Sequence, residues 1–247
     1  TMGTTVLTLR PGQQFWGGVA RGETRLKIED AEALRSQTLG LLKVSPELQS
    51  RMQVAYLRWN SSNTLMGVWP EYFEIYNHEV VAGRFFTEGE LRGRRRVAVL
   101  GHNLPESLGE TPPELLVGQT IQLRGIPFEV VGVLKEKGDA AWVRPDDQVF
   151  IPQSTAQYRV MGGRDRLNAI YAATESTEEL DRAYAEIDRV MRREHRMRPG
   201  EEADFNIRNS ADLLETFNET NETFTLLLAG IAGVSLLVGG IGIMNIM

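Results

Sequence analysis

The sequence predicts an α+β fold in which both ends of the chain build one domain around an inserted β-rich segment, followed by a membrane-spanning helix. Patterns in the order β-α-β occur near the start of the chain and again near its end. The stretch between them, residues 80–153, consists mainly of short strand-like runs. The last stretch, residues 224–247, carries no charge.

The first β-α-β unit opens with a strand at residues 6–10, which Pro11 and Gly12 end. The glycine-rich residues 13–24 predict a loop. Residues 28–37 predict a helix, because apolar residues share one face and two acidic residues occupy the first turn, where the helix dipole favours them.

A pair of strands completes this unit. Partial alternation of apolar residues predicts a strand over residues 49–59, and residues 64–69 are expected to pair back onto it. The polar residues 60–63 predict the turn between the two strands. A short helical turn is expected to open at Pro70.

The middle of the chain predicts strands at residues 97–100 and 148–152. Two apolar-rich runs, residues 116–123 and 127–134, flank Arg124-Gly125 and predict a hairpin.

The second β-α-β unit comprises a strand at residues 168–173, an amphipathic helix at 178–195 and a strand at 203–208. A last helix is expected to start at Asn209 or Ser210 and to continue into the tail. The sequence therefore divides into a discontinuous α+β subdomain, an inserted β-rich subdomain, a stalk helix and a transmembrane helix, at residues 1–79 with 154–209, 80–153, 210–223 and 224–247.

The uncharged tail is long enough to cross a bilayer. As a helix it would reach about 36 Å, against roughly 30 Å for the hydrocarbon core. The alternative is a buried helix of a soluble protein, but such helices rarely use an uncharged run of this length. Small residues that suit close helix packing in a membrane recur four apart, at Ala229, Gly233, Ser235 and Gly239.

The segment before the tail indicates the orientation. No Lys or Arg lies between Arg208 and residue 224, while four acidic residues do. Basic residues flank the cytoplasmic side of membrane helices, so residues 1–223 are expected on the outer side. The apolar face of the stalk helix is expected to be formed by Leu213, Leu214 and Phe217.

Composition and motifs exclude several functions. A net charge of −6 argues against nucleic acid as a partner, and the absence of cysteine removes thiol chemistry and cysteine metal sites. No phosphate-binding loop motif occurs, the histidines lack metal-ligand spacing, and the serines lack a nucleophile elbow. We therefore expect a non-enzymatic chain without cofactor or metal.

Exposed aromatic residues are the remaining candidates for contact with an apolar substrate or partner. Core packing is the expected role of most of them. The candidates for contact are Trp142, in a charged loop, and the pair Phe85 and Phe86.

A series of motifs in register resembles the MacB-type ABC transporter permeases and covers nearly the whole chain. The tail ends in GGIGIMNIM, which is similar to the second transmembrane helix of that family. The other matching stretches follow in the family's order: VWPEYF at 68–73, AGRFF at 82–86, VAVLG at 97–101, VGQTI at 117–121, FEVVGVL at 128–134 and VFIP at 149–152. Lys27 departs from the family, in which Ser or Thr often caps the first helix.

The resemblance implies an extracytoplasmic domain between the first and second helices of a permease, with a porter-like part formed by both chain ends and an inserted sabre-like part. It implies a dimer with a second permease copy, a cytoplasmic ABC ATPase that holds ATP and Mg²⁺, and a periplasmic adaptor (membrane fusion protein). The location would be the bacterial inner membrane, with residues 1–223 in the periplasm.

The function implied is the transmission of ATP-driven motion across the membrane, which exports or extracts a peptide, drug, toxin or lipoprotein. The alternative is an FtsX-like or peptide-sensing permease that regulates a cell-wall hydrolase or a signalling partner without transport.

Overall fold

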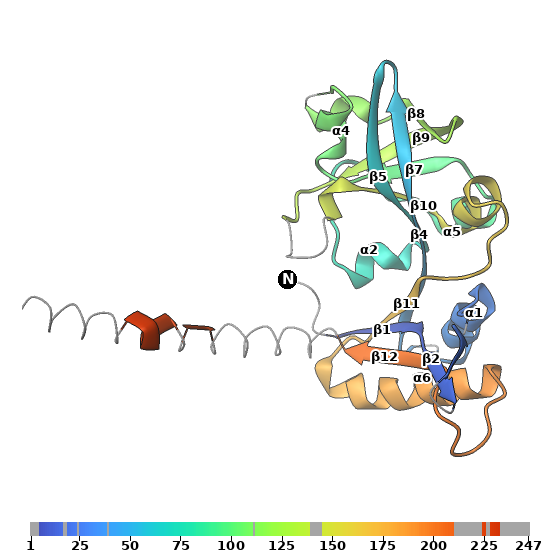
Figure 1. The fold of residues 1–247 in the computed structure, drawn as a ribbon. Coiled ribbons are helices and arrows are strands. Elements are labelled where there is room, and N and C mark those ends of the chain that lie inside the picture. The colour runs from blue at the N-terminus through green and yellow to red at the C-terminus, as the bar shows by residue number, and fades with distance from the viewer. Residues whose placement is uncertain are drawn as a thin grey trace, which may run out of the picture.

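The computed structural model describes residues 5–16, 19–23, 25–38, 40–110, 112–138, 145–209, 224–225 and 228–232. They form two lobes, one above the other in Figure 1, which share strand β4 (Lys43–Tyr56). The strands of the sheet follow the order β12-β1-β11-β4-β5-β10-β7-β9-β6, and β8 pairs with β4 and β9. Strand β4 therefore belongs to both lobes.

The lower lobe consists of a four-stranded sheet with two helices on one face. Its strands are β1 (Val6–Pro11), β11 (Ala169–Ala173), β12 (Phe205–Asn209) and residues 43–47 of β4, and its helices are α1 (Ile28–Gln37) and α6 (Leu180–Glu194). A separate hairpin pairs β2 (Gln13–Trp16) with β3 (Val19–Glu23). Alternating residues of β1, such as Leu7 and Leu9, pack in one buried cluster with Leu34 and Ile187 of the helices.

The upper lobe is a closed ring of six strands. Residues 48–56 of β4 pair with β5, and the ring continues through β10, β7, β9 and β8 back to β4. The strands of this lobe are β5 (Trp59–Val68), β6 (Val80–Gly83), β7 (Val97–Leu100), β8 (Thr120–Leu123), β9 (Ile126–Leu134) and β10 (Gln148–Pro152). Closure leaves β6 as the edge strand, which limits exposed backbone groups.

Short helices cover the upper lobe and the space between the lobes. They are α2 (Glu71–Ile75), α3 (Glu88–Arg92), α4 (Leu104–Ser107), η1 (Pro113–Leu116), η2 (Pro145–Asp147), α5 (Gln153–Thr155) and the π-helical turn η3 (Ala156–Val160). In the lower lobe, the short helix η4 (Thr177–Glu179) directly precedes α6. Helix α2 packs against β4 and β11, on the sheet face opposite to α1 and α6.

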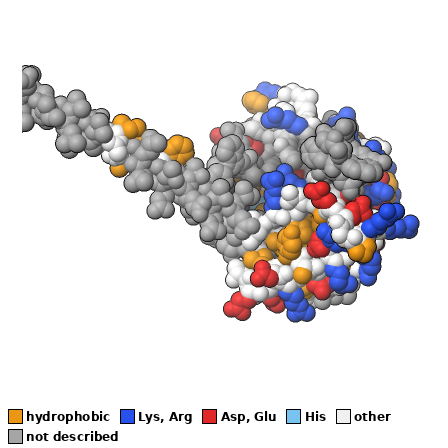
Figure 2. Space-filling model, turned by 60° about the horizontal axis from the view of Figure 1, so that its bottom comes forward, with side chains coloured by type: hydrophobic (Ala, Val, Ile, Leu, Met, Phe, Trp, Pro, Cys, Tyr) orange, Lys and Arg blue, Asp and Glu red, His pale blue; other side chains and the backbone are white. Residues whose placement is uncertain are grey.

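The lower face of the molecule, which α6 covers, carries basic and acidic side chains interspersed with hydrophobic ones (Figure 2). Ion pairs three or four residues apart on α6 join Arg189 to Glu186 and Arg192 to Asp188. Such exposed pairs stabilise a helix only slightly.

The structure confirms several predicted elements, namely the first strand, helix α1, the hairpin around Arg124-Gly125, helix α6 and strand β12. Arg124 and Gly125 have φ angles of 52° and 78°, as a tight hairpin turn with the right-handed strand twist requires. The two outer units share one sheet, since β1 lies between β11 and β12 and β11 pairs with β4.

Two local predictions are wrong. The expected loop at residues 13–24 contains the hairpin of β2 and β3. The expected turn at residues 60–63 lies inside β5, and the chain reverses at Leu57 and Arg58, where Leu57 has a φ of 50°. Leu57 has no turn-forming character, so the local sequence gave no signal for this turn.

The strand pairing places the transition between lobes inside β4, between Glu47 and Leu48, and puts β5 with the upper lobe. The division of the chain into subdomains at residues 79 and 153 stays a prediction. In the described part of the chain, no helix combines the length and apolar character needed to cross a membrane. Residues 224–225 and 228–232 are helical, and the stalk at 210–223 lies outside the described residues.

Candidate functional site

Arg35 of α1 links the lower lobe to helices α2 and α3. Its guanidinium lies 2.8 Å from Oε1 of Glu71 and 3.3 Å from Oε1 of Glu88. The same group lies 5.0 Å from the centre of the Trp69 ring, which is a cation–π contact. Since α1 belongs to the lower lobe and α3 to the upper one, Arg35 bridges the seam between them.

A cavity of about 620 Å³ opens beside this bridge, between α1, α3 and α5. Its walls combine apolar side chains, such as Ile28 and Leu91, with charged ones. Glu88 is shared, because it also lies 3.2 Å from Arg92. Burial raises the pKa of Glu71. The ion pairs of Arg35 with Glu71 and Glu88 thus hold α1 to α2 and α3.

A buried polar cluster lies on the other face of β4. The Tyr171 hydroxyl donates to the carboxylate of Glu47, which is 4% exposed. Burial raises the pKa of Glu47 and that of Tyr76, which lies beside it. The rings of Tyr76 and Tyr171 are 5.2 Å apart and nearly perpendicular. This cluster joins α2 to the lower sheet.

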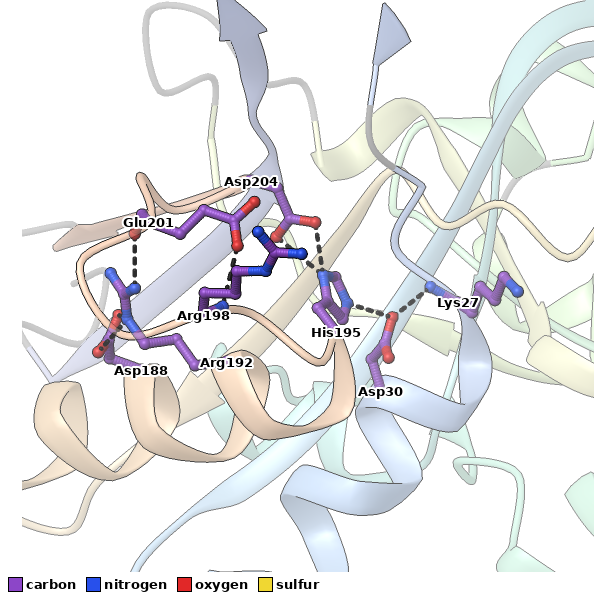
Figure 3. A network of polar contacts seen from close by, with 8 residues as sticks. All are labelled: Lys27, Asp30, Asp188, Arg192, His195, Arg198, Glu201 and Asp204. Atoms are coloured by element: carbon purple, nitrogen blue, oxygen red, sulfur yellow. Dashed lines mark hydrogen bonds and ion pairs between the residues drawn. The ribbon is translucent and has the colours of Figure 1, made fainter. Parts of the chain in front are cut away.

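The third group of contacts surrounds His195, at the end of α6 (Figure 3). Its Nδ1 lies 2.8 Å from Asp204, just before β12, and its Nε2 lies 3.3 Å from Asp30 of α1. Contacts with Asp204 and then Asp30 raise the pKa of His195 to about 9, so it is a cation at neutral pH. Asp30 also accepts a hydrogen bond of 2.7 Å from the Lys27 backbone N–H, which fixes the start of α1.

The surroundings of His195 carry further polar contacts. Arg192 donates to Asp188 and to the Glu201 carbonyl, and the Glu201 carboxylate accepts from the Arg198 backbone N–H. These bonds hold the loop between α6 and β12. The His195 clamp, which we define as His195 with Asp30 and Asp204, therefore fastens α1, α6 and β12 to one another.

The structure places only some of the predicted contact residues. Phe85 is partly buried and stacks on Phe73, with ring centres 4.4 Å apart, and Phe86 is 2% exposed and packs against the same ring. Gly83, which precedes them, has a φ of 78°, and a Cβ there would lie 2.2 Å from the Val131 oxygen. The AGRFF stretch thus fits a packing role. Ala229 is exposed in the described tail helix.

The other predicted residues lie outside the described residues: Trp142, Leu213, Leu214, Phe217, Gly233, Ser235 and Gly239. Among the described residues, no group of His, Asp and Glu side chains is arranged to hold a metal ion. Sequence reasoning missed Arg35 and His195, because Arg35 and Glu88, and likewise His195 and Asp30, are distant along the chain. The only signal for His195 is its position at the end of the helix predicted over residues 178–195.

Comparison with known proteins decides the family. Residues 1–190 match the model of the MacB-like periplasmic core domain. The chain belongs to this family.

Two MacB proteins align with the whole chain. The "Macrolide export ATP-binding/permease protein MacB" of Bdellovibrio bacteriovorus is 35% identical over 252 residues, and the protein of that name in Rhodospirillum rubrum is 37% identical over 253 residues. The chain spans 38% and 37% of these two relatives, so it corresponds to well under half of a MacB protein.

Two solved structures share the fold. The periplasmic region of MacB from Actinobacillus actinomycetemcomitans superposes with a TM-score of 0.70 and 22% identity, covering 88% of this chain and 94% of that one. The extracellular domain of the noncanonic ABC-type transporter YknZ from Gram-positive bacteria has a TM-score of 0.65 and 20% identity, covering 83% and 100%. These similarities establish a mixed α/β fold of the MacB periplasmic type.

Proposed function

We propose that this MacB-like chain passes motion from a cytoplasmic ATPase to the outer side of the membrane and makes no chemical bond itself. The relatives carry the name ATP-binding/permease protein and are more than twice as long, so ATP binding is assigned to a domain outside this chain, on the same protein or on a separate subunit. Export is the proposed outcome, with a periplasmic adaptor and a second permease copy as partners. Because these relatives are named for macrolide export, a macrolide is the first substrate to test.

The observation that carries the proposal is the way the two lobes are connected. The His195 clamp fastens α1 and α6 to the strand from which the chain leaves the sheet, at Asn209. Helix α1 then reaches the upper lobe through Arg35. A displacement that enters at Asn209 therefore moves α1 together with β12, and the contacts of Arg35 with α3 must shift as α1 moves against the upper lobe.

The remaining parts follow from the sequence. Residues 210–223 form the stalk, with Leu213, Leu214 and Phe217 on its apolar face, and residues 224–247 form the second transmembrane helix of a permease in the inner membrane. The helix packs through Ala229, Gly233, Ser235 and Gly239. In this arrangement residues 1–223 lie on the periplasmic side.

A cleavable cross-link across the seam tests the proposal. The chain contains no cysteine, so Arg35→Cys with Glu88→Cys introduces one pair in a full-length protein freed of other cysteines. The two side chains meet across the seam, and a short cleavable bis-thiosulfonate reagent can bridge them. We expect the cross-link to abolish erythromycin tolerance while ATP hydrolysis continues, and reduction to restore tolerance.

The matched control is Glu79→Cys with Lys135→Cys, which replaces an ion pair of 2.9 Å within the upper lobe. Cross-linking there should leave tolerance intact. Tolerance that persists with the seam fully cross-linked would refute motion between the lobes. A second variant, Leu214→Pro, breaks the stalk helix, and normal transport by it would reject the stalk as the transmitter. The unmodified full-length protein must confer tolerance before the variants are compared.

A further inference from the structure

A second cavity lies at the end of the lower sheet where β1 finishes, away from the seam. It encloses about 760 Å³ and is lined by four arginines, one aspartate and three further residues: Arg10, Arg25, Arg164, Arg166, Asp165, Pro11, Leu167 and Asn168. Volumes of this size hold small-molecule ligands.

Backbone hydrogen bonds hold the walls of this arginine pocket together. The Leu167 N–H donates to the Leu26 carbonyl at 2.8 Å, which joins the segment before β11 to the segment before α1. The Asn168 N–H donates to the Glu47 carbonyl, also at 2.8 Å. Arg10 comes from β1, whose neighbour in the sheet is β11. The arginines thus sit on three segments whose relative position is fixed.

The charge balance of this pocket is opposite to that of the whole chain. Four arginines face one aspartate in a chain of net charge −6. In the seam cavity, by contrast, Arg35 and Arg92 both pair with Glu88. Neither Arg25 nor Arg164 forms an ion pair with another described residue, and Arg10 interacts electrostatically with the buried carboxylate of Glu47. Arg10, Arg25 and Arg164 are all exposed. Repulsion between cations of one sign opposes folding, and an anion bound among these arginines would relieve it.

We propose that the arginine pocket binds a small polyanion through its oxyanion groups. A guanidinium presents its N–H donors in a planar fork that matches a carboxylate or a phosphate with two parallel hydrogen bonds. Three or more forks around one cavity suit a ligand with two or more such groups. The pocket is separate from the seam, so this site is independent of the transport proposed above.

Titration calorimetry on the chain in uncharged detergent tests the site, with pyrophosphate as the phosphate probe and citrate as the carboxylate probe. At about 0.15 M salt, where long-range attraction is screened, we expect saturable binding of one probe per chain. Arg25→Gln with Arg164→Gln should weaken it about tenfold or more, because each change removes charged hydrogen bonds. Thermal unfolding of the variant verifies that it is folded.

The control is Arg51→Gln with Arg182→Gln, which removes the same charge from exposed positions on β4 and α6 outside the pocket. Its affinity should equal that of the unchanged chain. Tighter binding of pyrophosphate assigns the site to phosphates, and tighter binding of citrate assigns it to carboxylates. Absence of saturable binding of both probes, or equal weakening in the pocket and control variants, overturns the proposal.

Discussion

The Nδ1 atom of His195 lies 2.8 Å from Oδ1 of Asp204, and this contact joins the end of helix α6 to the residue before strand β12. Asp30 holds the other ring nitrogen, and the side chains of His195 and Asp30 are both 10% exposed. A cation between two nearly buried carboxylates is costly to neutralise. The contribution of this clamp to stability therefore depends on pH.

The first prediction concerns this pH dependence. The pKa of His195 is raised from 6.5 to about 9 by Asp204 and Asp30, so the folded state holds its proton more tightly. Its stabilisation is full below pH 6.5 and is lost as the pH rises to about 9, with a total of up to about 3 kcal/mol. Urea unfolding between pH 6 and 9.5 should show the stability difference from His195→Gln shrinking over this interval.

Glu186→Gln serves as the control for His195→Gln, because it changes an exposed ion pair on the same helix. The difference in unfolding free energy between Glu186→Gln and the unchanged chain should stay constant between pH 6 and 9.5. If the stability difference for His195→Gln is equally independent of pH, the histidine is not held as a cation.

The second prediction concerns Arg35. Arg35→Lys keeps the charge but cannot contact Glu71, Glu88 and the Trp69 ring together, because an ammonium lacks the planar fork. We expect about 1 kcal/mol of lost stability in urea unfolding at neutral pH. Amide hydrogen exchange should become faster in α1 and α3, while exchange in β7 and β9 stays unchanged. Unchanged exchange in both helices would exclude a role for Arg35 at the seam.

The third prediction concerns the contact between β5 and η3. A Cβ at Gly67 would lie 2.5 Å from the Cβ of Ala156. Gly67→Ala should therefore destabilise the chain by about 1–3 kcal/mol through overpacking. Adding Ala156→Gly removes the clash, so the double variant should be more stable than the sum of the two single effects predicts. Strict additivity in thermal unfolding would show that this contact is not tight.

The fourth prediction concerns the buried Glu47. Its pKa is raised by burial, and the hydrogen bond from Tyr171 opposes that shift. Tyr171→Phe removes the donor and leaves a buried carboxylate, which should cost about 1–3 kcal/mol at pH 8.

The loss from Tyr171→Phe should be smaller near pH 5. A raised pKa means that the folded state binds the proton more readily than the unfolded state, so the penalty grows as the pH rises. Glu47→Gln, which removes the charge and keeps an acceptor, should be at least as stable as the unchanged chain at pH 8. A loss from Tyr171→Phe that is equal at both pH values would contradict a charged Glu47.

Local sequence patterns predicted much of the fold. Helix α6 and the hairpin at Arg124-Gly125 have strong local signals, namely apolar periodicity and a Gly at the turn. The turn at Leu57 has none, because its left-handed backbone is imposed by the long pairing of β4 with β5. The glycine-rich residues 13–24 predict a loop, yet they contain the β2–β3 hairpin, because glycines are common in both loops and hairpin turns.

The contacts of the candidate site were harder to predict. Arg35 and Glu88 are 53 positions apart, and Asp30 lies near the other end of the chain from His195, although Asp204 follows His195 by nine positions. A single sequence contains no periodicity that relates such positions. The family resemblance implies the fold type, whereas the Arg35 bridge and the His195 clamp are visible only in the folded structure.

Strand β4 has a consequence for how the two lobes can rotate. It passes from one sheet to the other without a break in its hydrogen bonding, at Glu47 and Leu48, so no hinge loop exists at that crossing. Rotation must be absorbed by changing the twist of fourteen extended residues, each by a small angle. A distortion that is distributed along the strand in this way is elastic. The two lobes should therefore return to their original relative orientation once the displacing force is removed.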